Sequence, residues 1–188
     1  MVDTFRSGLL ALCLSSLAWV AVGGNDAVPA VEDREVHVER SRRGFSVDLQ
    51  MHAPVSQSVA WAVLTDFDHM AAFVPNLKSS RIVERGENAL KVNQSGTARY
   101  GIIMIDFESV RDIRLVPERE IHSHGVGGNV KHMESVMHLE PEADGTRLQY
   151  HAEVEPDFWL PPLIGPSMVR HETAEQFSAI LQEMARRR

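Results

Sequence analysis

The chain has 188 residues, of which 44% are hydrophobic and 24% are charged, and its formal net charge at pH 7 is −7. These values are typical of one globular domain with a single core, and they exclude a disordered or collagen-like chain. Because the net charge offers no basic surface to neutralise phosphates, nucleic acid is not an expected partner.

Residues 1–24 differ in composition from the rest of the chain. Arg6 precedes an uncharged, mostly apolar run, and the small residues Ala21 and Gly23 suit a signal peptidase. The run is shorter than the roughly 20 apolar residues of a membrane-spanning helix, and serines interrupt it. We therefore expect residues 1–24 to be the signal peptide of an exported, periplasmic protein; the alternative is an uncleaved N-terminal anchor. Cys13, the only cysteine, lies in this segment, so the mature chain would form no disulfide.

The next segment, residues 25–43, is polar and dense in charge. It indicates a linker or, where REVHVER alternates, a short edge strand. The main domain is expected over residues 44–188. Its first segment alternates cleanly, with Phe45 and Leu49 on one face, and predicts a half-buried strand that ends at Pro54.

The residues between Ser56 and Pro75 change to helical spacing and predict two short helices in tandem. Six further segments have the composition of strands, and the short turns between them, among them GVGGN at residues 125–129, predict an antiparallel meander. These segments lie near residues 79–85, 89–98, 102–115, 120–124, 131–139 and 146–154. After Pro166 an apolar stripe predicts a C-terminal helix of about 22 residues. The arginines at residues 186–188 are expected only to offset the dipole of this helix.

The order of these elements and three stretches of sequence resemble a known family. The stretches cover residues 61–86, 133–156 and 161–187. The most specific pattern is the set Asp66, Phe67, Met70, Phe73, Val74 and Pro75. On these residues the chain resembles the START-like or SRPBCC superfamily, in its polyketide cyclase/dehydrase and coenzyme Q-binding branch. The resemblance implies an α+β helix-grip fold, in which a curved antiparallel sheet wraps around the long C-terminal helix and encloses an apolar cavity.

Apolar side chains from several elements are predicted to line this cavity. The segment DFWLPPLIGP at residues 157–166 is expected to form its lip, with its aromatic residues toward the ligand; alternatively, Trp159 plugs one end of the core. Methionine suits the walls because its flexible, polarizable side chain adapts to an isoprenoid or fatty chain, although core filling explains methionines equally well. The candidate ligand-binding residues are Phe73, Met104, Met133, Met137, Tyr150, Phe158, Trp159, Leu160, Met168 and Phe177.

The sequence HSH at residues 122–124 raises the question of a metal site. If GVGGN closes a hairpin in which His124 faces His132, these two residues share one face of the sheet with His122 and Glu134, and the apolar residues take the other face. We therefore expect the histidines to face solvent, and we assign no metal site and no cofactor.

Polar groups inside the predicted cavity are few. Tyr150 is the best candidate, followed by Arg99, Glu108 and Arg111. They form no recognisable constellation for acid–base chemistry, so no catalytic residue is assigned.

The function expected from these observations is binding or transport of a hydrophobic small molecule: a lipid, a quinone or a polyketide-like compound. The alternatives are a polyketide cyclase/dehydrase-type enzyme on the same scaffold and a protein-docking module that uses the apolar segment at residues 157–166. Coenzyme Q-binding relatives act at an inner membrane from the inside, so export departs from their setting and weakens the case for a quinone. The expected partners are an apolar ligand and, transiently, a membrane; the sequence leaves the oligomeric state open.

Overall fold

The structure of the protein is a computed structural model. The residues it describes are 29–41, 44–157 and 164–188. The predicted signal peptide and three predicted lip residues, Phe158, Trp159 and Leu160, lie outside this part of the chain. Within the described ranges, no helix is both long and apolar enough to span a membrane.

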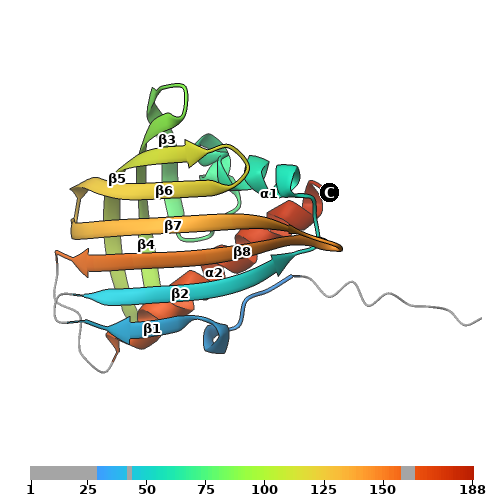
Figure 1. Cartoon of the computed structure of the whole chain (residues 1–188). Coiled ribbons are helices and arrows are strands. Elements are labelled where there is room, and N and C mark those ends of the chain that lie inside the picture. Colours follow the sequence, from blue (N-terminus) through green and yellow to red (C-terminus); the bar gives the residue numbers. More distant parts are fainter. Residues whose placement is uncertain (1–28, 42–43, 158–163) are drawn as a thin grey trace, which may run out of the picture.

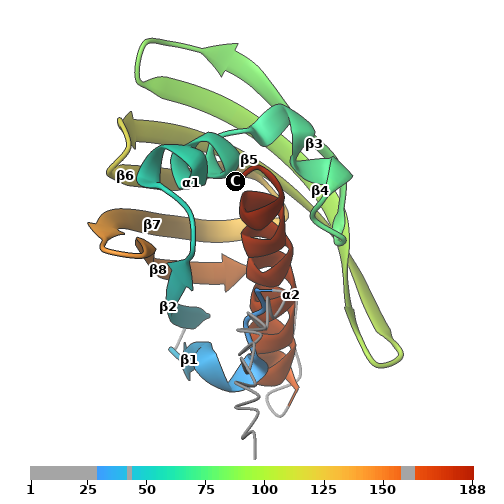
Figure 2. The same ribbon diagram turned by 90° about the vertical axis from the view of Figure 1, so that its right-hand side faces the viewer.

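One antiparallel sheet of eight strands forms most of the molecule (Figure 1). The strands follow the spatial order β1-β2-β8-β7-β6-β5-β4-β3, so β3 to β8 form the predicted meander and β2 pairs with β8. Their bounds are β1 His37–Arg40, β2 Phe45–Ala53, β3 Leu77–Arg85, β4 Ala89–Tyr100, β5 Ile103–Val116, β6 Glu120–Gly128, β7 Val130–Glu142 and β8 Gly145–Pro156. The sheet is strongly curved, and the long helix α2 (Gly165–Arg186) lies along its concave side (Figure 2).

The helices begin where the sequence predicts them. The short helices α1 (Gln57–Leu64) and η2 (Phe67–Ala72) follow β2 and confirm the predicted tandem. Ser56 is the N-cap of α1, and its Oγ accepts a hydrogen bond from the backbone N–H of Val59 at 3.4 Å. The helix α2 has 22 residues, with Pro166 in its first turn, where a missing backbone N–H leaves no helical bond unmade.

The core lies between the concave face of the sheet and α2. Every second residue of β2 is buried: Phe45, Val47, Leu49, Met51 and Ala53. The apolar stripe of α2 reaches the same interior through Phe177, Ile180, Leu181 and Met184. Because the strands and the helix each have one apolar face, these faces must cover one another. The predicted α+β helix-grip fold is thereby confirmed.

The segment before β2 joins both layers of the molecule. β1 pairs with β2 at the edge of the sheet, so the short strand predicted as one of two alternatives is observed. Before it, the short 3-10 helix η1 (Asp33–Glu35) packs against α2. The backbone N–H of Val31 donates a hydrogen bond to Ser178 Oγ at 2.8 Å. The residues just before β1 are therefore tethered to the C-terminal helix, although the sequence indicated a linker there.

The hairpin between β6 and β7 differs from its prediction. β6 continues through Gly128, and His124 lies opposite Glu134, not opposite His132. Glycines predict a turn, but inside a strand they also permit a bulge or the close approach of another backbone. A Cβ atom at Gly128, where φ is +102°, would lie 2.0 Å from the carbonyl oxygen of Glu108. The glycines therefore extend the strand as well as turning the chain.

Strand β6 has a bulge between Gly125 and Gly127, where it pairs with β5. Arg111 pairs with Gly125, but the preceding residue, Val110, pairs with Gly127. Val126 is therefore an extra residue in β6, and bulges of this kind redirect neighbouring side chains. The bulge lies opposite Arg111, a residue of the site described next.

Candidate functional site

A cavity of about 360 Å³ lies between the concave face of the sheet and α2. Most of its wall comes from η2, strands β4 to β8 and α2, with single residues from α1, β2 and β3, and most of the lining side chains are apolar. They include Leu64, Phe67, Met70, Ile105, Phe107, Met133, Met137, Met168, Phe177 and Ile180. The volume lies within the range of about 300–1,000 Å³ that is typical of small-molecule sites.

Five of the predicted ligand-binding residues line this cavity. They are Met133, Met137, Tyr150, Met168 and Phe177. The methionines come from β7 and α2, so the cavity is walled on both the sheet side and the helix side by flexible side chains.

Two predicted residues, Phe73 and Met104, are not part of the lining and correct the prediction. Phe73 is half-buried at the margin of the core, and the guanidinium carbon of Arg187 lies 5.8 Å from the centre of its ring. Met104 is 67% exposed. The alternation of β5 turns Ile105 and Phe107 into the cavity and therefore turns Met104 away from it.

Tyr150 places a hydroxyl inside the cavity, as its inward position on β8 predicts. Its ring packs against that of Phe177, with centres 4.8 Å apart, and its side chain hydrogen-bonds with Ser135. Burial raises the pKa of Tyr150, although the positive charge of Arg111 and the bond to Ser135 oppose this. The phenol is therefore neutral at physiological pH and offers a hydrogen bond rather than a charge.

Arg111 brings a positive charge to the cavity wall. Alternation along β5 places it on the same inward face as Ser109 and Ile113. Its Nη2 donates a hydrogen bond to Oε1 of Gln94, and Nε2 of Gln94 donates to Ser80 Oγ at 2.9 Å, which holds the amide in place. Burial lowers the pKa of Arg111 because loss of water disfavours the charged form, but a guanidinium remains protonated at neutral pH.

Several polar atoms near Arg111 are without hydrogen bonds. Within the described part of the chain, Arg111 Nε and the buried hydroxyls of Ser109 and Ser123 make none. Among the same residues, no carboxylate acts on the pKa of Arg111. Buried polar groups are normally satisfied by protein or water. Unpaired donors in a cavity wall therefore mark the place where a polar part of a ligand would bind.

Glu172 is a second ionisable side chain of the cavity, and the sequence did not single it out. It lies on α2 and is 8% exposed. Nδ2 of Asn76 and the backbone N–H of Arg99 each donate a hydrogen bond to one of its carboxylate oxygens. Burial raises the pKa of Glu172, and the bond from Arg99 opposes this. Its position three residues after Val169, on the apolar stripe, was the signal that could have identified it.

Two other polar candidates have exposed side chains. They are Arg99, which reaches the interior only through its backbone, and Glu108, at the margin of the cavity. The polar groups that the fold brings together in the interior are thus Arg111, Tyr150 and Glu172.

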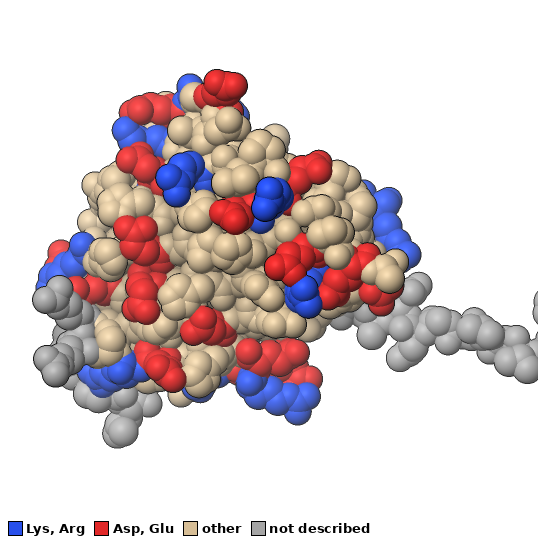
Figure 3. Space-filling model, viewed as in Figure 1, with Lys and Arg blue, Asp and Glu red and all other residues tan. Residues whose placement is uncertain are grey.

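The outer face of the sheet, turned away from α2, carries several charged side chains that face a partner of opposite type. Acidic and basic side chains are scattered over this face (Figure 3). His122 Nε2 lies 2.8 Å from Glu120 Oε2, and His124 forms an ion pair with Glu134. A depression of about 840 Å³ on this side is lined mainly by charged and histidine residues. The HSH histidines are thus partly accessible to solvent, in a register that differs from the predicted one.

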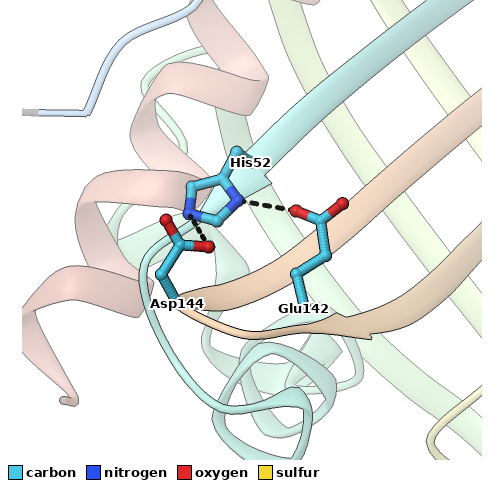
Figure 4. Close-up of side chains that lie close together, drawn as sticks. All are labelled: His52, Glu142 and Asp144. Carbon is cyan, nitrogen blue, oxygen red and sulfur yellow. Dashed lines mark hydrogen bonds and ion pairs between the residues drawn. The ribbon is translucent and has the colours of Figure 1, made fainter.

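A cluster at the end of β2 joins the strand to the β7–β8 turn (Figure 4). His52 Nδ1 lies 3.0 Å from Glu142 Oε2, and His52 Nε2 lies 3.8 Å from Asp144 Oδ1. All three side chains are exposed, and one ligand atom from each lies within 4.8 Å of the others. Arg147 also lies 3.4 Å from Glu142. These contacts connect the end of β2 to the β7–β8 turn.

An antiparallel sheet that wraps one long helix and encloses an apolar cavity defines the START-like helix-grip class of proteins. The chain belongs to the family described as polyketide cyclase / dehydrase and lipid transport. The model of that family matches residues 53–177, which is more than half of the chain. The predicted family is confirmed.

Solved structures share the fold. A START superfamily protein from Mycobacterium smegmatis has a TM-score of 0.66 at 14% identity, over 76% of this chain and 99% of its own. The Zhui aromatase/cyclase from Streptomyces sp. R1128 has a TM-score of 0.62 at 18% identity, over 80% and 96%. A STAR-related lipid transfer protein from Xanthomonas axonopodis has a TM-score of 0.65 at 13% identity, over 80% and 92%. At these identities the likeness shows the fold alone. No curated protein matches the chain.

Proposed function

We propose that the protein binds a hydrophobic small molecule, of the lipid, quinone or polyketide-like class, and carries it in the cavity between the sheet and α2. The apolar, methionine-rich lining of this cavity carries the proposal. Methionine side chains accommodate hydrocarbon chains of different shapes. Membership of a family that includes lipid-transport proteins supports the same function.

An apolar ligand would also stabilise the protein. The lining of an empty cavity lacks packing partners, so its side chains lose dispersion contacts that a ligand restores. A ligand that binds only the folded state raises its stability in proportion to the logarithm of ligand concentration. The melting temperature is therefore expected to rise when a suitable apolar compound is added.

A neutral fluorescent probe, N-phenyl-1-naphthylamine, tests the proposal. The variant Met133→Trp places a bulky ring in the cavity, and Met104→Trp places the same ring on the outer face as a matched control. Overpacking costs about 1–3 kcal/mol, so probe affinity should fall about tenfold in Met133→Trp and stay unchanged in Met104→Trp. Equal affinity in all three proteins would mean that the probe binds outside the cavity. If the wild type does not bind the probe, the proposed carrier function is contradicted.

The natural ligand can be identified directly. The protein is purified under mild conditions, extracted with organic solvent and analysed by mass spectrometry. An apolar compound in the extract of the wild type, depleted in Met133→Trp but not in Met104→Trp, would name the ligand class.

A cyclase or dehydrase on the same scaffold is the second candidate function. The observation in its favour is the presence of hydrogen-bond donors, Tyr150 and Arg111, inside the cavity. Tyr150→Phe removes the hydroxyl and keeps the ring that packs on Phe177. An enzyme that uses the hydroxyl would lose product formation from a poly-β-ketone while still binding the compound. A carrier would return the compound unchanged with either residue at this position.

We also propose that the protein is exported, on the basis of the apolar run in residues 1–24. Mass measurement of the protein from its native cells tests this, because cleavage after the small residues near Gly23 would remove the segment. An intact N-terminus in a membrane fraction would favour the anchored form instead. Transient membrane contact and the protein-docking alternative stay predictions, since the segment that would serve docking lies mostly outside the described residues.

A further inference from the structure

Among the residues that the structure describes, the cavity contains a cation without a counter-charge. Arg111 is part of its wall, and its one hydrogen-bond partner among the described side chains is the neutral amide of Gln94. A buried charge costs several kcal/mol unless an opposite charge and hydrogen bonds compensate it. On the outer face, by contrast, histidines and arginines face carboxylates. An interior cation left unpaired is expected where a ligand supplies the missing charge.

We propose that the ligand is an amphiphile with one carboxylate, which the Arg111 guanidinium binds inside the cavity, while the hydrocarbon part of the ligand lies among the methionines. This proposal rests on the proposed function, because it concerns the same cavity. It adds the chemical class of the headgroup and the residue that selects it.

The donors around Arg111 are placed for an anion. Ser109 precedes it by two residues on the same face of β5, and Ser123 lies on the neighbouring strand β6, opposite Ile113. Both hydroxyls and Arg111 Nε are buried without partners in the described structure. A guanidinium binds a carboxylate through two parallel N–H groups, and hydroxyls can donate to the same oxygens. Ser109 and Ile113, the residue opposite Ser123, lie roughly 13 Å apart along β5, so a single carboxylate on Arg111 would reach at most one of the two hydroxyls.

The guanidinium is held before a ligand arrives. Ser80 Oγ donates to the carbonyl oxygen of Phe67 in η2, and Gln94 Nε2 donates to Ser80. This chain of bonds turns Oε1 of Gln94 toward Arg111 and fixes the Nη2 end of the guanidinium. Nε makes no hydrogen bond among the described residues and is the donor that a ligand would satisfy. A site held in this way loses less conformational entropy on binding.

None of the other ionisable groups of the described cavity wall fills the role of counter-charge. Glu108 is exposed at the margin of the cavity and does not act on the pKa of Arg111. The two oxygens of Glu172 already accept hydrogen bonds from Asn76 and Arg99. Tyr150 is hydrogen-bonded with Ser135 and is neutral at physiological pH. With one cation in the wall, a singly charged carboxylate balances the site, whereas a phosphate group carries about 1.5–2 negative charges.

The test compares a fluorescent fatty acid with its uncharged ester. The delipidated full-length protein is titrated with cis-parinaric acid and with methyl parinarate, which share one hydrocarbon chain. The wild type should prefer the acid by at least about tenfold, since a hydrogen bond to a charged group contributes about that factor or more. Arg111→Met should abolish the preference, and Arg111→Lys, which keeps the charge without the planar fork, should retain part of it. The matched control is Arg114→Met, on the exposed face of the same strand, which should keep the full preference.

The outcomes separate this proposal from the carrier function. Equal affinity of the wild type for acid and ester would overturn the carboxylate proposal and leave the carrier function standing. Binding of neither probe would count against both. A preference for the acid that Arg111→Met retains would place the anion elsewhere and overturn the assignment to Arg111.

A stability measurement distinguishes ligand recognition from a structural role of Arg111. If Arg111 serves binding, the ligand-free protein carries an uncompensated charge, and Arg111→Met should melt at a higher temperature than the wild type. If Arg111 serves only to hold Gln94, the variant should melt lower. Should Arg111→Met fail to fold, Ser109→Ala and Ser123→Ala provide the second test. Each removes one unpaired hydroxyl, and the variant that loses the hydroxyl beside the bound carboxylate should reduce the preference for the acid without lowering the affinity for the ester. An unchanged preference in both variants would contradict the proposed site.

Discussion

The two faces of the sheet treat charged side chains in opposite ways. On the outer face, His124 pairs with Glu134, and Arg147 pairs with Glu140. On the concave face, Arg111 lines an apolar cavity, and within the described ranges its one hydrogen-bonding partner is a neutral amide. Pairs in water contribute little to stability and need no explanation by function. An interior charge without a pair lowers stability, so its presence indicates a role other than stabilising the fold.

The largest loss of stability is expected from truncating a core residue of β8. Leu148 is 0% exposed, and its truncation in Leu148→Ala should lower the free energy of unfolding by about 2–5 kcal/mol. The side chain of its neighbour Gln149 faces the outer side of the sheet. Gln149→Ala should therefore change the free energy of unfolding by no more than about 0.5 kcal/mol. Urea unfolding of both variants measures the difference between the two faces on one strand. Similar losses would contradict the assigned faces.

A smaller effect is expected at the end of α2, where a charge pair is partly buried. Arg187 lies 2.6 Å from Glu183, whose side chain is 5% exposed, and 2.8 Å from Asp66. Arg187→Ala should cost about 1–3 kcal/mol, as expected for hydrogen bonds to charged groups. Arg188→Ala, on the next and exposed residue, is the matched control.

The pH dependence of this loss follows from the pKa of Glu183. Burial by itself would raise that pKa, but hydrogen bonds from Arg187 and Arg186 outweigh it and lower the pKa below 4.5. The pair therefore stabilises the protein above pH 4.5 and loses its effect as the pH falls through the lowered pKa. Urea unfolding at several pH values should show the wild type and Arg187→Ala converging in acid. A constant difference would mean that the loss comes from packing on Phe73 instead.

Glu172 should show the opposite pH dependence. Because burial raises its pKa above 4.5, the folded state binds its proton more tightly than the unfolded state, and stability falls as the pH rises from 4.5 through the raised pKa. In Glu172→Gln, which cannot ionise, this fall should be absent. The stability difference between variant and wild type should therefore move in favour of the variant as the pH rises. Glu175→Gln, one turn along the same helix, removes a charge that contributes to the raised pKa of Glu172, so it should weaken the trend without abolishing it.

The smallest effect is expected for the paired charges of the outer face. His124→Gln should change the free energy of unfolding at pH 7 by less than about 0.5 kcal/mol, because exposed ion pairs contribute little. Urea unfolding measures it. A loss above about 1 kcal/mol would mean that pairs on this face contribute substantially to folding, and the contrast between the two faces would no longer hold.

Local patterns predicted most of the fold because they depend on near neighbours. The period of two in β2 and β8 and the stripe on α2 identified the strands, the helix and their buried faces. The same alternation placed Tyr150 inward. Arg111 was named only as a lower-ranked interior candidate, together with Arg99 and Glu108, whose side chains are exposed. Met104 was misplaced because methionine character, and not strand alternation, suggested it. The β6–β7 register was wrong because glycine suits both turns and bulges.

The candidate site was less predictable because its properties depend on residues far apart in the chain. Glu172 is an acid on an apolar stripe, and only the approach of Asn76 and Arg99 explains how it is accommodated. Gln94 also lies on an inward strand position, but its importance depends on Ser80 and Arg111.

By itself, the sequence determined which residues form strands and helices and which of their faces are apolar, because hydrophobic periodicity is a property of a short segment. It thereby determined a sheet and a long helix that must cover one another. Only the tertiary structure decided that the covering leaves a cavity, and that Arg111 reaches it without a carboxylate beside it. Whether a charge is compensated depends on what lies across the interior from it, and this is settled only when the sheet closes around α2.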